Sequence, residues 1–247
     1  MIAYIGIWAI SPKHLFADNL KDELWLVAGG VFGGSLYFFT ENTALGITQA
    51  SNVAFIICTA PLLTTILSLL FYKSEKATKG LIYGSLLALI GVGLVVFNGS
   101  VVLKLSPVGD LLTLLAALSW AFYSLVIKWM TGRYPTVFIT RKIFFYGVLT
   151  ILPAFLLHPL QPDFDVLLQP LVLSNLLFLA VLASLICYIL WNVVLKQLGT
   201  MRASNYIYLN PLVTMVASVL ILHEQITWIT LMGAACIILG VYLAEKK

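Results

Sequence analysis

Eight apolar stretches, each close to twenty residues long, follow one another along the sequence and limit its fold more than any other feature. A helix needs about 20 apolar residues to cross a bilayer, where its backbone must satisfy its own hydrogen bonds. Hydrophobic residues make up 61% of the chain and charged residues 10%, which a soluble fold cannot accommodate. We therefore predict an all-α integral membrane protein, a helical bundle with spans at residues 24–46, 50–72, 80–98, 108–130, 137–157, 171–195, 203–222 and 226–244.

Lys and Arg are distributed unequally over the segments that flank these stretches. When the flanks are assigned alternately to the two sides of the membrane, one side receives only Lys104. Cytoplasmic loops carry the excess of Lys and Arg, so the other side is predicted to be the cytoplasm, with both chain termini there. That side receives thirteen basic residues, namely Lys13, Lys21, Lys73, Lys76, Lys79, Lys128, Arg133, Arg141, Lys142, Lys196, Arg202, Lys246 and Lys247.

One motif occurs twice in the chain. Leu45–Asn52 reads LGITQASN and Leu198–Asn205 reads LGTMRASN, and each copy leads to a proline, Pro61 or Pro211. Five predicted crossings separate the copies, and because five is odd the copies must point in opposite directions. This is the pattern of an inverted repeat, which many secondary transporters build around a site near the midplane. The offset is 153 at the motif, 150 at the proline and 149 at three later pairs, Glu75/Glu224, Gly84/Gly233 and Gly91/Gly240.

The repeat divides the chain into residues 1–98 and residues 108–247. The second segment contains five predicted spans, whereas the first contains three full spans and the apolar stub MIAYIGIWAI, which is too short to cross a bilayer. Aligning the two segments places the start of the first about 40 residues before Met1. We therefore expect an N-terminally incomplete first repeat, with in-frame sequence for one and a half further spans upstream.

The order of these motifs resembles that of a known family. Paired five-helix units, a P…E…G…G pattern closing each unit, and GDLLTLLAALSWAFYSLVIKWM opening the second are similar to the EamA-like family of the drug/metabolite transporter superfamily. The resemblance covers essentially Leu24 to Lys247. It implies a ten-span carrier of the inner (plasma) membrane that moves amino acids or related small metabolites, often outward, by alternating access. This chain retains about eight full spans of that pattern and the N-terminal stub.

The implied partners are a small-molecule substrate and the lipid bilayer, with protons as a candidate coupling ion and a homodimer as a candidate assembly. No enzyme, metal or cofactor motif is found in the sequence: Cys58, Cys187 and Cys236 lie singly in apolar runs, and phosphate loops and H-E-x-x-H are missing. No basic tail offers a surface for nucleic acid. A membrane-embedded enzyme would need a clustered polar constellation, and a non-transporting subunit or small-pore channel stays open as the alternative function.

Polar groups at membrane depth carry a cost of about 2.5–3.5 kcal/mol when charged, so they are expected to face the bundle interior or a wet cavity. Glu41 lies in YFFTENTALG, five residues before Gly46 and hence about 7 Å inside the outer end of its run. It is a candidate for binding a proton or a substrate ammonium, with Asn42 beside it. The alternative is a helix-end carboxylate that reaches the outer water.

Aromatic residues suggest further candidate lining. Trp120 and Tyr123 lie three residues apart in the middle of a run, on one helix face, where they either line a cavity or pack against lipid and neighbouring helices. Tyr188, Trp191 and Asn192 lie nearer the inner end of their run, where an aromatic belt is the ordinary explanation.

The segment NYIYLNP, which leads into Pro211, supplies the remaining candidates. A proline inside a membrane helix frees a backbone carbonyl, and Asn210 is placed either to support that opening or to reach a ligand. Tyr206 and Tyr208 lie on different faces, so at most one of them is expected to line a central cavity. Pro61 and Pro211 are therefore predicted to break their helices and to contribute to gating.

Charged and small residues near the ends of the runs receive structural interpretations. Glu75 and Glu224 end the matched helices on opposite sides of the membrane and are predicted to cap the next helix or close a gate. Arg141 and Lys142 are interpreted as topology determinants at the cytoplasmic face, with attraction of an anionic group as the alternative. Close helix packing is predicted for four glycines at matched spacing, Gly84, Gly91, Gly233 and Gly240.

Overall fold

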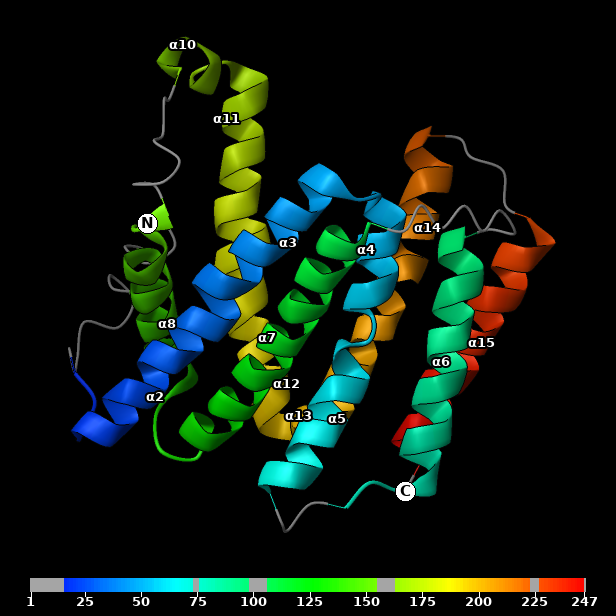
Figure 1. Ribbon diagram of the computed structural model, residues 1–247, viewed down its shortest axis with the longest axis horizontal. Helices are drawn as coiled ribbons and strands as arrows, with labels where there is room; N and C mark the ends of the chain where they lie inside the picture. The colour runs from blue at the N-terminus through cyan, green and yellow to red at the C-terminus, as the bar shows by residue number, and fades with distance from the viewer. Residues whose placement is uncertain (1–15, 73–75, 98–105, 155–162, 223–226, 247) are drawn as a thin grey trace. The chain divides into compact units, whose positions relative to one another are not determined.

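The computed structural model describes residues 16–72, 76–97, 106–154, 163–222 and 227–246 (Figure 1). All regular secondary structure in these ranges is helical, which confirms the all-α prediction. Within the described ranges, five helices are long and apolar enough to cross a membrane: Ala50–Phe71, Lys79–Phe97, Pro107–Thr131, Pro170–Leu198 and Trp228–Glu245. The other three predicted runs are helical over residues 20–47, Thr136–Ile151 and 200–222.

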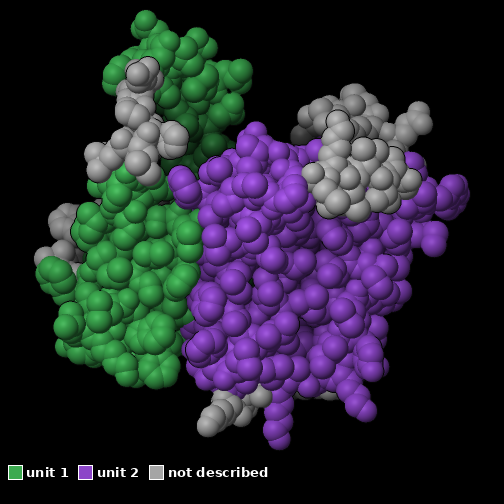
Figure 2. All heavy atoms as spheres, in the orientation of Figure 1, with its two compact units in different colours: residues 1–36, 126–197 green, residues 37–125, 198–247 purple. Residues whose placement is uncertain are grey.

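The chain forms two compact units, each built from segments distant in the sequence (Figure 2). Unit 1 comprises Met1–Leu36 and Val126–Gln197, and unit 2 comprises Tyr37–Leu125 and Leu198–Lys247. Each unit therefore takes residues from both halves of the predicted repeat.

Unit 1 is organised around α2 and α8. Asn19 caps the start of α2, since its side chain accepts a hydrogen bond from the backbone N–H of Asp22. A Cβ atom on Gly30 would lie 2.5 Å from the Tyr146 side chain and 2.8 Å from the Gly147 backbone nitrogen, so only glycine permits this approach. The described helices of the unit are α2 (Leu20–Gly30), η1 (Val31–Ser35), α8 (Thr136–Ile151), α10 (Phe164–Leu167), α11 (Pro170–Leu177), η2 (Phe178–Ile186) and α12 (Cys187–Leu198).

A short π-helical turn, η1, links α2 to α3 (Leu36–Ile47) without a break. A π turn inserts a residue into the helical hydrogen-bond ladder and leaves backbone groups in need of partners. The hydroxyl of Tyr188 donates to the Gly33 carbonyl at 2.5 Å, and Asn192 Nδ2 donates to Thr140 Oγ1 at 2.9 Å. Both side chains are buried. Tyr188 and Asn192 of α12 therefore hold helices of this unit together.

Unit 2 contains antiparallel helices joined by polar contacts. The chain segment of α4 and α5 descends in Figure 1, whereas that of α13 and α14 ascends beside it. The hydroxyls of Ser68 and Thr200 lie 3.1 Å apart and fasten α5 to α13. The unit includes most of α3 and α7 (Pro107–Thr131) together with α4 (Ala50–Ile57), α5 (Ala60–Phe71), α6 (Lys79–Phe97), α13 (Thr200–Asn205), η3 (Tyr206–Leu209), α14 (Asn210–Leu222) and α15 (Trp228–Glu245).

Glycines bring α6 and α15 into backbone contact. A Cβ on Gly84 would lie 2.4 Å from the carbonyl oxygen of Gly240, and a Cβ on Gly91 would lie 2.6 Å from that of Gly233. Real Cβ atoms do not approach this closely, so the predicted role of all four glycines in close helix packing is confirmed.

Both matched helices are interrupted just before their prolines. Helix α4 ends at Ile57 and α5 resumes at Ala60, with a turn at residues 58 and 59. In the second copy the 3-10 turn η3 separates α13 from α14. The two interruptions share one buried core cluster, which consists of Cys58, Ala88, Val92, Tyr208, Ile237 and Val241.

Candidate functional site

Glu41 lies on the inward side of α3. The side chains of Thr40 and Ala44, on the same side of the helix, are buried, whereas Asn42 is exposed. Glu41 itself is half-buried, and its Oε1 accepts a hydrogen bond of 2.9 Å from the hydroxyl of Tyr37, one turn earlier. The carboxylate is therefore held toward the interior of unit 2.

Helix α7 supplies aromatic rings to the same place. The ring centroids of Tyr37 and Trp120 lie 5.2 Å apart, and those of Trp120 and Tyr123 lie 5.1 Å apart. Tyr123 is fully buried, whereas Tyr37 and Trp120 are half-buried. The structure thus brings together three of the predicted site residues, Glu41, Trp120 and Tyr123, through Tyr37. We call these four residues the Glu41 cluster.

The four residues of the Glu41 cluster include one carboxyl group and no basic side chain. Among the residues that the structure describes, the ion pairs join Asp22 to Arg133 and Glu23 to Lys142, and none involves Glu41. If the predicted span 24–46 crosses the bilayer, a carboxylate whose hydrogen-bond donor among the described residues is Tyr37 is costly there unless it binds a proton or a cation during function. This arrangement can take up either.

The remaining predicted lining residues do not join the cluster. Asn42 donates to the carbonyl of Phe38 on its own helix at 2.7 Å and is exposed. Tyr206 and Asn210 are exposed, and the Asn210 carbonyl accepts from Thr214 at 3.1 Å.

Pro61 and Pro211 lie at the start of α5 and α14, just after the two interruptions. Because proline has no N–H, the carbonyls four residues earlier, those of Ile57 and Ile207, lose their α-helical donor, and the Ile207 carbonyl accepts from the backbone N–H of Asn210 instead. Glu75 and Glu224 lie outside the described residues, so their predicted capping or gating role stays a prediction.

Tyr37 was not among the predicted site residues, and for Tyr206 and Tyr208 the prediction was that at most one lines a central cavity. Tyr208 is fully buried in the core cluster between the two interruptions, next to Cys58. Nearby, Ser85 donates to Asn205 Oδ1 at 2.8 Å, an interhelical bond between α6 and α13. Tyr37 precedes Glu41 by four residues, and that spacing alone places the two side chains on one helix face.

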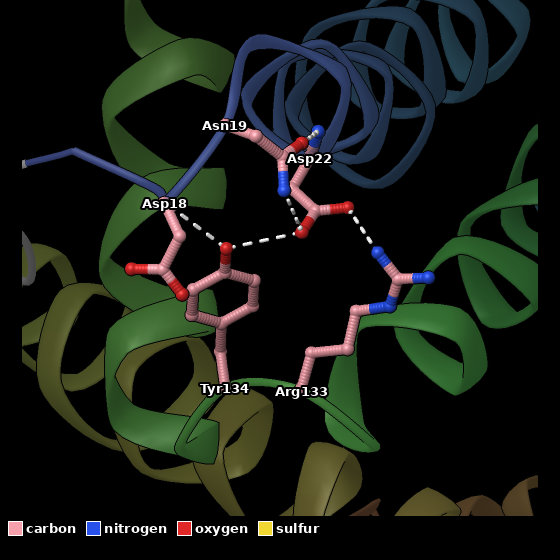
Figure 3. Close-up of polar contacts among 5 residues, drawn as sticks. All are labelled: Asp18, Asn19, Asp22, Arg133 and Tyr134. Atoms are coloured by element: carbon pink, nitrogen blue, oxygen red, sulfur yellow. Dashed lines mark hydrogen bonds and ion pairs between the residues drawn. The ribbon is translucent and has the colours of Figure 1, made fainter.

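Unit 1 contains a separate group of charged residues around Asp22 (Figure 3). Arg133 Nη1 lies 2.7 Å from Asp22 Oδ1, and the hydroxyl of Tyr134 donates to Asp22 Oδ2 at 3.0 Å. The backbone N–H of Asp18 donates to that hydroxyl at 2.9 Å, and Asn19 Nδ2 donates to Asp22 Oδ2 at 3.0 Å. Asp22 is buried. These contacts fasten the start of α2 to the turn between α7 and α8.

The next carboxylate, Glu23, binds the adjacent helix. Lys142 and the hydroxyl of Tyr146 both donate to Glu23 Oε1, and the backbone N–H of Ala17 donates to Glu23 Oε2 at 2.7 Å. Arg141 and Lys142 are both buried. Their interpretation as residues that only set topology is therefore incomplete: Lys142 holds an anionic group, and that group is Glu23.

Lys142→Met is expected to lower the free energy of unfolding by about 2 kcal/mol, less than the about 3–5 kcal/mol typical of a fully buried ion pair. The loss is smaller because Tyr146 and the backbone of Ala17 still donate to Glu23. Denaturant unfolding of the purified protein measures the difference. In the double variant with Glu23→Gln, the loss should be smaller than the sum of the two single losses, and additive losses would contradict the pairing.

Stability should also depend on pH through Glu23, which lies just before the first predicted span. Burial raises the pKa of its carboxyl, but the hydrogen bonds from Lys142, Tyr146 and Ala17 outweigh burial and hold that pKa below its ordinary value of 4.5. A lowered pKa in the folded state means that the carboxylate contributes stability above pH 4.5, which is lost as pH falls below that value through the folded-state pKa. We expect the melting temperature to fall more in wild type than in Glu23→Gln over that window.

Comparison with known proteins decides the family. The sequence profile of the EamA-like transporter family matches residues 1–97 and 107–245, nearly the whole chain. The chain belongs to the EamA-like transporter family. The resemblance inferred from the motif order, to this family of the drug/metabolite transporter superfamily, is therefore confirmed.

Relatives of this EamA-like protein are named as transporters. An "Uncharacterized transporter" of Archaeoglobus fulgidus is 26% identical, with 97% of this chain and 82% of that protein covered. A "Probable amino-acid metabolite efflux pump" of Salmonella typhimurium is 27% identical, with 94% and 80% covered. A protein known by its crystal structure superposes with a TM-score of 0.79 at 18% identity, over 99% of this chain and 82% of that one, which supports the fold. These names indicate a transporter and not an enzyme.

Proposed function

We propose that this EamA-like protein is a secondary transporter that moves small organic metabolites, amino acids or related compounds, across the inner membrane by alternating access. Family membership over nearly the whole chain carries the proposal. The substrate class follows from the relatives in Salmonella typhimurium and Escherichia coli that are named as amino-acid metabolite efflux pumps.

The proposed architecture is a pair of inverted repeats, with eight full spans in this chain and both termini in the cytoplasm. Residues related by a two-fold axis meet their own equivalents near that axis. The core cluster of unit 2 supports this, because its six residues are three pairs at the repeat offset of 150 or 149: Cys58 with Tyr208, Ala88 with Ile237 and Val92 with Val241.

The packing of α6 on α15 gives independent support. In a two-fold arrangement, if one residue contacts a second, the equivalent of the first contacts the equivalent of the second. Gly84 contacts Gly240, and Gly91 contacts Gly233. In the repeat, Gly84 is equivalent to Gly233 and Gly240 is equivalent to Gly91. The contact between Gly84 and Gly240 is therefore equivalent to the contact between Gly233 and Gly91, as a two-fold arrangement requires.

In this proposal the Glu41 cluster belongs to the substrate pathway. A carboxylate that alternates between water and a closed interior takes up and releases a proton, which would couple transport to a proton gradient. Asn42, Tyr206 and Asn210 are proposed as further lining in conformations that open the pathway.

Metabolite profiling tests the proposal. Cells that overproduce the protein and cells that lack it are compared for the intracellular and extracellular levels of amino acids and their derivatives. We expect a small set of chemically related metabolites to shift in opposite directions inside and outside when the protein is overproduced. Unchanged profiles in both strains, with the protein present in the membrane, would contradict the proposal.

A further inference from the structure

We infer that the transported solute carries a cationic amine, and that the Glu41 cluster recognises it by charge and by an aromatic ring face. The inference rests on the proposed transport function and adds the chemical class of the substrate.

The charge of Glu41 selects a cation. The carboxylates Asp22 and Glu23 each contact a basic side chain, whereas Glu41 forms no ion pair within the described part of the chain. Tyr37 donates to Oε1, and a carboxylate has two oxygens that accept hydrogen bonds, so an ammonium group could bind at Oε2. A solute with a carboxylate or phosphate at this position would be repelled.

The rings of the cluster complement an ammonium group. A cation within about 6 Å of an aromatic centroid is attracted by the ring quadrupole, and indole is the best of the side-chain rings. The ring centroids of Trp120 and Tyr37 lie 5.2 Å apart, and the hydroxyl of Tyr37 donates to the Glu41 carboxylate. Tyr37 therefore contacts both the indole and the carboxylate. Trp120 is half-buried, whereas Tyr123 is fully buried against it.

The four residues divide into two roles. Glu41 and Trp120 are assigned to contact the amine. Tyr37 and Tyr123 are positioning residues: the hydroxyl of Tyr37 fixes the carboxylate, and the ring of Tyr123 supports Trp120 from its buried side. The cluster contacts only the amine end of the solute, because it contains no basic or amide side chain that would bind a carboxylate.

Three probes of equal skeleton test the inference on the purified full chain in lipid nanodiscs: 2-phenylethylammonium, neutral 2-phenylethanol and anionic 3-phenylpropionate. Binding is measured by calorimetry, and empty nanodiscs correct for partition into lipid. We expect the ammonium probe to bind at least about tenfold more tightly than either of the others, the difference that a desolvated cation–π contact and a charge pair provide. Equal binding of the three probes would overturn the inference without the need for any variant.

Variants assign the interaction to the cluster. Glu41→Gln and Trp120→Leu should each weaken binding of 2-phenylethylammonium about tenfold and leave 2-phenylethanol unchanged, whereas Trp120→Phe should retain part of the affinity. Tyr37→Phe removes only the hydroxyl and should weaken the charged probe alone. Unchanged ammonium binding in both Glu41→Gln and Trp120→Leu would refute the assignment.

The two failures are distinguishable. If metabolite levels respond to the protein but no amine binds, the transport function holds and the substrate class is wrong. If the amine binds through Glu41 but no metabolite moves, the site is correct and the transport function is wrong.

Discussion

Glu41→Gln is expected to abolish transport driven by a pH gradient, while the protein inserts and folds normally. Glutamine keeps the size of the side chain, and its carbonyl oxygen still accepts from the Tyr37 hydroxyl, so the local geometry survives. Only the titratable charge is removed. A hydrogen bond to a charged group is worth about 1.5–3 kcal/mol, so the rate should fall by about tenfold or more.

The measurement is uptake into proteoliposomes with and without an imposed pH gradient. Glu41→Asp, which keeps the charge on a shorter side chain, should retain the response to pH at a lower rate. Thr43→Val is the matched control, because Thr43 is exposed and bonds only to the Phe39 carbonyl of its own helix among the described contacts. Wild-type rate and pH dependence in Glu41→Gln would show that Glu41 is a solvated helix-end residue.

Gly91→Leu is expected to prevent folding. Its Cβ would lie 2.6 Å from the carbonyl oxygen of Gly233 and 2.7 Å from the backbone nitrogen of Ile237, and neither can move aside without separating α6 from α15. Overpacking usually costs about 1–3 kcal/mol, and a clash with two backbone atoms of α15 should exceed that range. The yield of monodisperse protein by size-exclusion chromatography after detergent extraction measures the effect.

Gly46→Leu provides the control for this substitution. A Cβ on Gly46, which lies within α3, meets nothing within 4 Å. Leucine should therefore be tolerated there, and should even gain about 1 kcal/mol of helix propensity. Equal yields of the two leucine variants would refute the backbone contact between α6 and α15.

The helices could be predicted because their signal is local. The run predicted at 80–98 is helical over Lys79–Phe97, and that at 226–244 over Trp228–Glu245, since apolar length alone specifies a membrane helix. The interruption at residues 58 and 59 lies inside the run predicted over 50–72, just before Pro61, which was predicted to break its helix. A proline leaves one backbone carbonyl without its helical hydrogen bond, but the sequence does not say at which residues the helix is interrupted.

The candidate site could be predicted in part. Glu41 was predicted as a site residue because a charged side chain is costly in a membrane, and Trp120 because it lies in the middle of its apolar run. Their link through Tyr37 is a tertiary contact between α3 and α7, which the sequence does not show. The pairing of Glu23 with Lys142 joins residues 119 positions apart, and only packing selects such partners. For this reason Arg141 and Lys142 of α8 were predicted to lie at the cytoplasmic face, whereas the structure shows both side chains buried.

Counterflow in proteoliposomes tests the central claim, that this protein is an alternating-access carrier, most directly. Vesicles are loaded with a high concentration of the unlabelled metabolite whose extracellular level rises most on overproduction, and a trace of the labelled compound is added outside. A carrier exchanges one molecule for another, so we predict transient accumulation of label inside above its outside concentration, and none in empty vesicles. Label that only equilibrates would identify a channel, and label that does not enter would identify a non-transporting subunit; either result contradicts the account.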